Sequence, residues 1–326
     1  MAARRFFTSC PPAPAPPGKS NRFPFRALTR SRDRRAGRSI FPFFAMLVGS
    51  AFCFAPRAAA QENAYFVTYT QALEEPGNLE VEFRGTTASP KNGNQFLSGT
   101  IELEYGTTRW WTTEFYLSGQ STLNDSTIFN GFRVENRFRP FLKNHVINPV
   151  FYVEYENLNR ADRSVLEVTG HDSITDLIVP NSIERPQLER SIETKLILGS
   201  NFRGWNFSEN FIAEKDLNEP EPWEFGYALG VSHRLGSASS STCLLCRKNF
   251  RAGAELFGGL STLDDFGWKG TSQYLGPIVS FRIPHGPLFM FSPDFGLNAN
   301  SVGVVYRIKV SYEFENFLGR SHKGDR

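Results

Sequence analysis

Apolar and polar residues alternate with period two along most of the chain after residue 78. Because successive side chains of a β-strand point to opposite faces, this alternation predicts strands that each have one apolar and one polar face. In the clear example 97–105, the apolar residues Leu97, Ile101 and Leu103 are separated by polar ones. The expected strands, about twelve in all, lie within 79–83, 97–105, 111–117, 132–139, 151–156, 189–198, 205–213, 223–231, 250–256, 275–283, 289–295 and 302–314.

Two kinds of all-β protein alternate in this way. A soluble sandwich or barrel turns its apolar face inward, whereas a transmembrane antiparallel up-and-down β-barrel of about 12 strands turns it toward lipid and encloses a polar lumen. The face opposite the apolar one carries Glu and Arg in comparable numbers on neighbouring strands. Charges enclosed in a lumen need partners of opposite sign, so this face favours the membrane barrel. Glu209 falls on the apolar face, which we attribute to a bulge or a strand end.

The lengths of the connections support the same fold. A barrel with both termini in the periplasm has short periplasmic turns and longer outer loops, in alternation. Short links occur at positions that should be periplasmic, and the longer polar links fall mostly in the other class. The short links are 106–109, 202–204 and 284–287, the long ones are 118–128, 157–185, 215–222 and 261–273, and the exceptions are 140–147 and 236–249.

In these features, residues 78–314 resemble the porin-like outer-membrane β-barrels of Gram-negative bacteria. The resemblance implies an outer-membrane location, contact with lipid, delivery by the secretion and barrel-assembly machinery, and passage of small hydrophilic solutes. We expect residues 61–77 to form a short periplasmic segment before the barrel. Such barrels commonly end on an aromatic residue, whereas here a polar tail at 315–326 follows Phe314, which is a departure from the pattern.

Residues 1–60 are interpreted as a basic leader followed by a secretory signal peptide. Three arginines at 34–38 precede the apolar run 40–54, and three alanines end at Ala60, after which we predict cleavage. The run is shorter than the roughly 20 residues of a spanning helix, which makes an uncleaved anchor the weaker alternative. An organelle transit peptide also has an Arg-rich lead, but the apolar core and the Ala-rich end favour secretion.

The charge of the chain is divided unevenly. Residues 1–60 hold 11 of the 36 basic residues and only one of the 33 acidic ones, so the rest of the chain is acidic overall. The sequence pI of about 8.6 therefore comes from the leader, and no basic helix or stripe follows it. We predict no nucleic-acid partner.

Charged residues on the polar faces of the strands are the candidate functional residues. Since residues i and i+2 of a strand point the same way, these side chains form columns inside the lumen. The columns either select ions across a constriction or close a narrow barrel by salt bridges. The candidates are Arg133, Glu135, Arg137, Arg139, Glu154, Glu156, Glu189, Glu193, Lys195, Arg307, Lys309 and Glu313.

Two cysteines remain after the leader, Cys243 and Cys246. A single CxxC without a second pair or a following His is weak evidence for zinc or haem, and an exported chain meets oxidising conditions. We therefore predict a local disulfide between Cys243 and Cys246. No cofactor and no metal is expected from the sequence.

Three functions remain in competition. The first is a passive channel for small hydrophilic solutes or ions, and the second is a structural or recognition barrel with a plugged lumen. The link 157–185 has an apolar middle and could either fold into the lumen or stay exposed. The third is a lipid-modifying enzyme, for which Ser232 and His233 are the candidates. Adjacent residues of a strand point to opposite faces, so these two side chains cannot share a proton, and we predict that the protein is not an enzyme.

Overall fold

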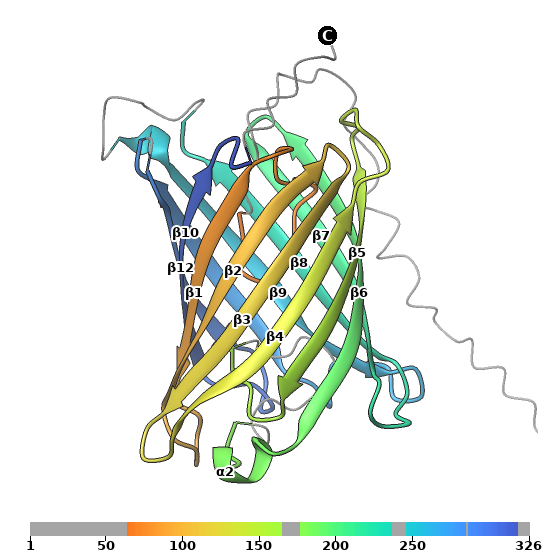
Figure 1. Ribbon diagram of the computed structural model, residues 1–326, viewed down its shortest axis with the longest axis vertical. Helices are drawn as coiled ribbons and strands as arrows, with labels where there is room; N and C mark the ends of the chain where they lie inside the picture. The colour runs from red at the N-terminus through yellow and green to blue at the C-terminus, as the bar shows by residue number, and fades with distance from the viewer. Residues whose placement is uncertain (1–63, 165–176, 237–245, 285, 319–326) are drawn as a thin grey trace, which may run out of the picture. The chain divides into compact units, whose positions relative to one another are not determined.

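The computed structural model describes residues 64–164, 177–236, 246–284 and 286–318. These residues form twelve antiparallel strands and two short helices (Figure 1). The strands are β1 (Leu79–Ala88), β2 (Phe96–Thr108), β3 (Trp111–Thr122), β4 (Thr127–Phe138), β5 (Asn148–Asn159), β6 (Leu188–Phe202), β7 (Trp205–Asp216), β8 (Glu224–Arg234), β9 (Phe250–Thr262), β10 (Gln273–Arg282), β11 (Leu288–Gly296) and β12 (Val304–Phe314). The helices are α2 (Asn181–Glu184) and the 3₁₀ turn η1 (Arg247–Asn249).

The sheet closes on itself. Each strand pairs with its neighbours in the chain, and β1 pairs with both β2 and β12, so none of the strands is left with a free edge. Closure satisfies the backbone hydrogen bonds that an open edge would expose to lipid. The expected all-β, up-and-down barrel of about twelve strands is confirmed. In the described part of the chain, no helix combines the length and the apolar character needed to cross a membrane.

The wall has an apolar outer face and a polar inner face. On β12, the apolar Tyr306 and Ile308 are 48% and 44% exposed, whereas Arg307 and Lys309 between and beside them are 6% and 1% exposed. The same alternation runs along the other strands, as in β2 and β3. A soluble barrel would show the reverse, with the charges outside, so the distribution of side chains identifies a membrane-spanning wall.

Glu209 departs from this pattern, and our explanation of it was wrong. Glu209 lies well inside β7 and pairs with Leu198 and Leu229 in an uninterrupted register. Its side chain is exposed on the outer face. The residue therefore carries a carboxyl group into the apolar surface without a bulge or a strand end to relieve it.

The two ends of the barrel differ in their connections. At the end where β1 begins and β12 ends, which we call the terminal end, β2–β3 and β6–β7 are joined by the tight turns 109–110 and 203–204. At the opposite end, the loop end, the longest link is 160–187 and contains α2, visible at the bottom of Figure 1. This agrees with the alternation expected from the sequence, except that the expected long link 118–128 is only the four-residue link 123–126. The longer links at the terminal end are the two expected exceptions, 139–147 and 235–249.

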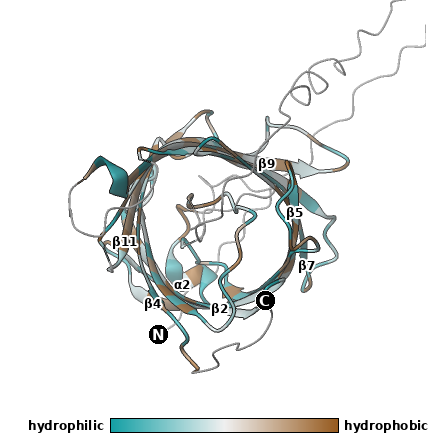
Figure 2. Ribbon diagram, turned by 90° about the horizontal axis from the view of Figure 1, so that it is seen from above, coloured by the Kyte–Doolittle hydropathy of each residue, from teal (hydrophilic) through white to brown (hydrophobic). Residues whose placement is uncertain are grey.

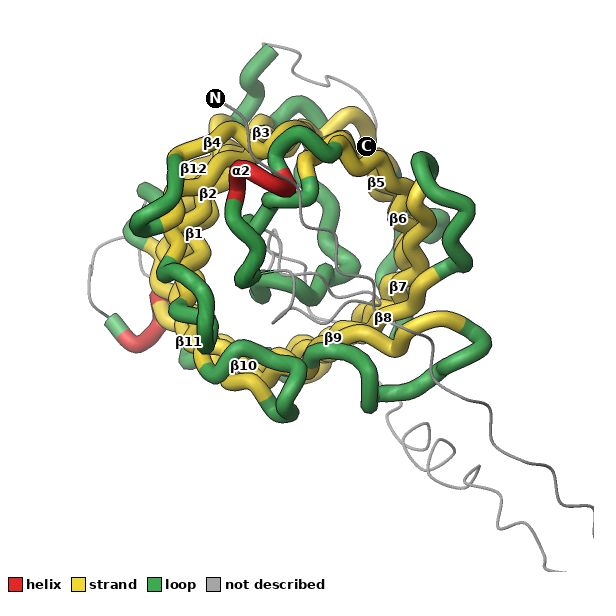
Figure 3. The backbone as a smooth tube through the Cα atoms, turned by 90° about the horizontal axis from the view of Figure 1, so that it is seen from below, coloured by secondary structure: helices red, strands yellow, loops and turns green. Residues whose placement is uncertain are grey.

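The segment before β1 lies inside the barrel. We expected residues 61–77 to form a separate periplasmic segment, but residues 64–70 are almost entirely buried and their hydrogen-bond partners lie on the inner wall. The expectation failed because a short segment without strand periodicity gives no sign of its distant partners. Figures 2 and 3, which look along the barrel from opposite ends, show loop backbone inside the ring of strands.

Candidate functional site in the barrel lumen

Residues 64–77, which we call the plug, cross the barrel interior from one wall to the other. Tyr65 lies against β7, where its hydroxyl donates to the side chain of Asn206 at 2.8 Å. Tyr69 reaches the opposite wall, where its hydroxyl donates to Glu135 Oε2 at 2.9 Å. The plug then turns to the terminal end, where the amide of Gly77 donates to a β2 carbonyl at 2.7 Å. The plug thus occupies part of the space that the strands enclose.

Side chains of the wall bind the main chain of the plug. The carboxylate of Glu255 on β9 accepts from the amides of Phe66, Val67 and Thr68 at 3.2, 3.0 and 3.1 Å. The side-chain amide of Asn210 on β7 accepts from the Tyr69 amide at 2.6 Å and donates to the Tyr69 carbonyl at 2.9 Å. Buried backbone groups need such partners, and these contacts replace the hydrogen bonds that a neighbouring strand would provide.

A gap in the side chains of the wall makes room for the plug. The register places Gly230 of β8 and Gly276 of β10 directly opposite Glu255, one on each side. A Cβ atom at Gly230 would come within 2.6 Å of the ring of Tyr65. Glycine is therefore required at position 230, where the Tyr65 ring lies against the wall.

The two plug tyrosines are buried and neutral. Tyr65 is fully buried and Tyr69 is 5% exposed. Burial is the main cause that raises the pKa of both hydroxyls, and the nearby Glu135 raises the pKa of Tyr69 further. Both hydroxyls therefore remain hydrogen-bond donors at neutral pH.

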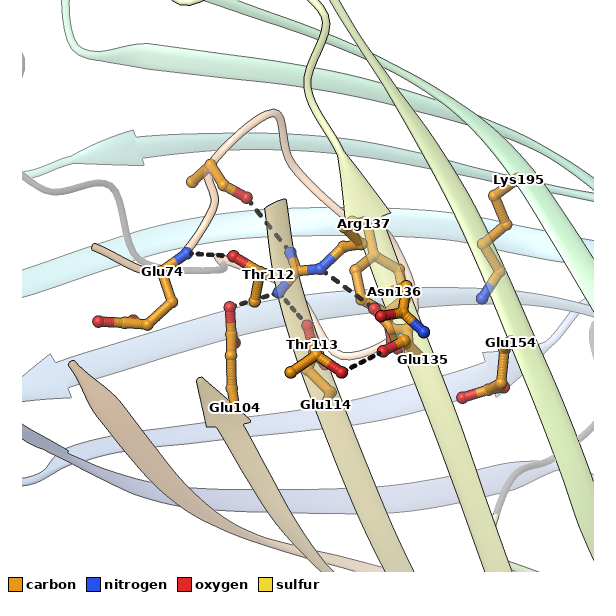
Figure 4. Close-up of polar contacts among 12 residues, drawn as sticks. Glu74, Glu104, Thr112, Thr113, Glu114, Glu135, Asn136, Arg137, Glu154 and Lys195 are labelled. Atoms are coloured by element: carbon orange, nitrogen blue, oxygen red, sulfur yellow. Dashed lines mark hydrogen bonds and ion pairs between the residues drawn. The ribbon is translucent and has the colours of Figure 1, made fainter. Parts of the chain in front are cut away.

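Arg137 is the centre of the ion pairs beneath the plug (Figure 4). Its guanidinium contacts Glu104 at 2.5 Å, Glu114 directly, and Glu135 at 3.1 Å. It also donates to the plug carbonyl of Ala72 at 3.2 Å. One buried cation therefore joins strands β2, β3 and β4 to the plug, which makes it a structural link as well as a lumen charge.

Further ion pairs surround the lumen on both sides of this centre. On β1 and β12, Glu82 contacts Arg84 and, at 2.9 Å, Lys309. Across the barrel, Arg133 pairs with Glu154 at 3.2 Å, and Lys195 with Glu193 at 2.6 Å. Arg307 pairs with Asp294 at 2.6 Å. Side chains of opposite sign thus offset each other within the wall, so the burial of each charge is compensated.

Most of the predicted lumen residues lie where the sequence placed them. Buried on the inner face are Arg133, Glu135, Arg137, Glu154, Glu193, Arg307 and Lys309. Lys195, Glu156, Glu189 and Glu313 are half-buried, and Glu313 accepts from Asn78 of the chain entering β1 at 2.5 Å. Arg139 lies just beyond the end of β4, where it contacts Asn144 of the following link, so it does not belong to the column.

Several lumen residues escaped the sequence prediction. Glu82, Arg84 and Asp294 lie on the same inner face, but we did not include them among the candidates. Period-two alternation would have found them. Glu255 and the plug tyrosines are different, because their role depends on contacts between residues far apart in sequence, and the alternation contains no signal for those.

The long link between β5 and β6 also enters the barrel. The described parts of it, 160–164 and 177–187, are called the inward loop. Arg163 is 2% exposed and donates to Thr122 of β3 at 3.3 Å and to the carbonyl of Val179 at 2.8 Å. Asn181 is fully buried and donates its amide to Asp125 at 2.9 Å. The described residues of this link combine the two conformations considered: 161–164 are buried or half-buried in the barrel, whereas most of 178–187 is exposed at the loop end.

A cavity of about 90 Å³ lies between the plug and the inward loop. Phe66, Val67 and Tyr69 of the plug and Ser164 of the inward loop contribute to its lining. Its charged lining combines bases on β1, β4, β6, β12 and the inward loop with acids of the loop and of β5 to β7. These residues are Arg84, Arg133, Arg160, Lys195, Arg307, Glu156, Asp162, Glu189, Glu193 and Glu214.

Two trios of carboxylates come close enough to coordinate a cation, with oxygens within 4.8 Å of one another. They are Glu102, Glu104 and Glu114, and Glu154, Glu156 and Glu193. In the described residues, Arg84 or Arg137 contacts every member of the first trio. Arg133 and Lys195 contact two members of the second. Basic side chains therefore already take the positions that a metal ion would need.

The remaining sequence candidates do not assemble a second site in the described part of the chain. Ser232 is 1% exposed and faces inward, where its hydroxyl accepts from Arg251 at 3.2 Å. His233 packs on the ring of Trp205, with centroids 4.6 Å apart, on the other face of the strand. As expected from their adjacency, they form no catalytic pair. Cys246 is disulfide-bonded, whereas Cys243 lies outside the described residues.

Comparison with known proteins finds likeness of fold. No protein-family model matches the chain, and no curated protein matches it in sequence. The KdgM porin shares 9% identity over 72% of this chain and 99% of its own, with a TM-score of 0.43. An outer membrane channel from Pseudomonas putida F1 shares 11% over 74% and 96%, with a TM-score of 0.45. LpxR from Salmonella typhimurium shares 7% over 72% and 99%, with a TM-score of 0.39.

The closed wall, its apolar outer face and its charged interior define a transmembrane, antiparallel up-and-down β-barrel. Exposed tryptophans at strand ends, including Trp110, Trp205 and Trp223, suit the two membrane interfaces. Within this class, the chain is a twelve-stranded barrel with its own N-terminal segment inside the lumen.

Proposed function

We propose that the protein is an outer-membrane channel for small hydrophilic solutes that the plug holds closed at rest. One observation carries the proposal: buried charged and polar side chains line much of the lumen, yet the space between them is filled by a segment that is bound through side chains and not built into the sheet. A barrel that had only to be rigid could fill its interior with the side chains of the wall.

The charges around the cavity give the proposed channel its filter. Arg133 and Glu156 face the same cavity from β4 and β5. Opposed charges beside a narrow passage favour hydrated ions and small polar solutes over apolar ones. With the plug displaced, these side chains line the path between the two ends of the barrel.

A single-channel recording in planar bilayers tests this function. The purified chain beginning at residue 61 is compared with the chain beginning at residue 75, which lacks most of the plug. We expect rare openings for the first and sustained conductance steps for the second. A heat-modifiable gel band of both proteins serves as the control for a folded barrel.

A structural barrel with a plugged lumen is the second candidate, favoured by the fact that the plug and the inward loop both fill the interior. It predicts that the shortened chain, folded by the same criterion, conducts no ions. That result would overturn the channel proposal. If Arg133→Glu left the ion selectivity of a conducting barrel unchanged, the proposed role of the cavity charges as a filter would be wrong.

A further inference from the structure

We propose that the inner faces of β3, β4, β7, β8 and β9 form a binding groove for a peptide, which residues 64–74 occupy in cis and which a separate peptide can occupy in trans. The inference rests on the proposed function for its physiological consequence, because a peptide that replaces the plug would control the channel. The binding itself is a separate property and can be measured without any current.

The groove binds main-chain atoms. Between Phe66 and Glu74, six plug residues have a backbone group bonded to a side chain of the wall, and the wall residues come from four strands. The wall partners are Glu255 for 66, 67 and 68, Asn210 for 69, Arg137 for 72 and Thr112 for 74. Main-chain groups are common to all peptides, so this part of the contact does not depend on sequence.

Specificity for the peptide sequence comes from the two places on the wall where the tyrosine rings of the plug bind. Tyr65 fits beside Gly230, and Tyr69 lies beside Lys195, whose ammonium is 4.7 Å from the ring centroid. These tyrosines are four positions apart, and the chain bends at residues 66 and 67 between them. The ligand class is therefore a peptide with aromatic residues four positions apart and aromatic or β-branched residues between them, as in Phe66, Val67 and Thr68.

The carboxylate of Glu255 needs hydrogen-bond donors from a bound segment. Glu255 is 1% exposed, and in the described part of the chain the hydrogen bonds to its carboxylate come from Phe66, Val67 and Thr68 of the plug. A carboxylate without partners in the interior is costly. The glycines on both sides of Glu255 supply no side chain to replace the plug. A second peptide restores the lost hydrogen bonds, which gives the groove an affinity of its own.

The test uses the full chain with a weakened plug, so that the trans peptide does not compete with a tethered copy at high effective concentration. The chain from residue 61 carries Tyr65→Ser and Tyr69→Ser. The probe is a fluorescein-labelled synthetic peptide with the sequence of residues 61–74, titrated in detergent and followed by fluorescence anisotropy. We expect saturable binding, at least tenfold weaker to the wild-type chain, where the plug occupies the groove.

Two changes separate main-chain recognition from simple hydrophobic capture. A peptide N-methylated at Val67 and Thr68 keeps every side chain but loses the donors to Glu255, and we expect its binding to be at least tenfold weaker. Glu255→Gln in the weakened chain should reduce binding of the unmodified peptide to a similar extent. Glu209→Gln, on the outer face of β7, is the matched control and should leave binding unchanged.

The outcomes separate the groove from the channel. Absence of saturable binding to a heat-modifiable barrel would overturn the groove, as would equal binding of the N-methylated and unmodified peptides. Conductance of the chain beginning at residue 75 without peptide binding would support the channel and overturn the groove. Peptide binding to a barrel that conducts no ions would support the groove and overturn the channel.

Discussion

Gly230→Ala is the sharpest test of how the plug is held. The new methyl group would lie 2.6 to 2.9 Å from three ring atoms of Tyr65, closer than carbon atoms approach, so the ring must move. Movement breaks the hydrogen bond from the Tyr65 hydroxyl to Asn206 and exposes part of a fully buried ring. Strain from overpacking and one lost hydrogen bond together weaken docking of the plug by about 2 to 4 kcal/mol.

The assay is hydrogen exchange, read by mass spectrometry, of the amides from Phe66 to Tyr69. A loss of about 2 to 4 kcal/mol raises the undocked fraction, and with it the exchange rate, about 30- to 1000-fold. Gly99→Ala, where the new methyl group meets Phe83 on the outer face, is the control and should leave these amides protected. Unchanged protection in Gly230→Ala, or equal loss in the control, would refute the docking geometry.

Three further changes have definite expected results. Burial, and after it the negative charges of Glu313 and Glu80, raise the pKa of Glu74 to about 8. Docking of the plug should therefore strengthen as pH falls from 8 toward 4.5. Glu74→Gln should abolish this pH dependence, measured by hydrogen exchange of the plug amides. Glu209→Leu should stabilise the barrel in lipid by about 1 kcal/mol, measured by urea unfolding. Arg137→Gln should destabilise it by about 3 to 5 kcal/mol, because three carboxylates lose their cation.

The strands were predictable because a wall with one apolar and one polar face produces a period-two alternation of apolar and polar residues in the sequence. Each residue of β12 between Tyr306 and Lys309 has the environment that the alternation predicts. The starts of strands were less certain. β4 begins at Thr127, five residues before the predicted stretch, since polar residues at the loop end, such as Asn130, suit either a strand or a loop.

The plug was not predictable from the same pattern. Several of its contacts join residues more than 130 positions apart, as between Tyr65 and Asn206 or Thr68 and Glu255. Its own sequence has no strand alternation, because its two sides contact different walls of the same lumen. A segment of this kind is stabilised by partners that only the closed barrel brings together.

The pairing of the strands around Glu255 nevertheless indicates the plug, and this feature could be sought in the sequence. Glu255 is the inward residue of β9 with Gly230 and Gly276 opposite it on both neighbouring strands. Because neither paired residue has a side chain, hydrogen-bond donors to this buried carboxylate must come from elsewhere in the lumen. Once the hairpins fix the register, such a position implies that a chain segment fills the gap and donates hydrogen bonds to the carboxylate, as residues 66–68 do.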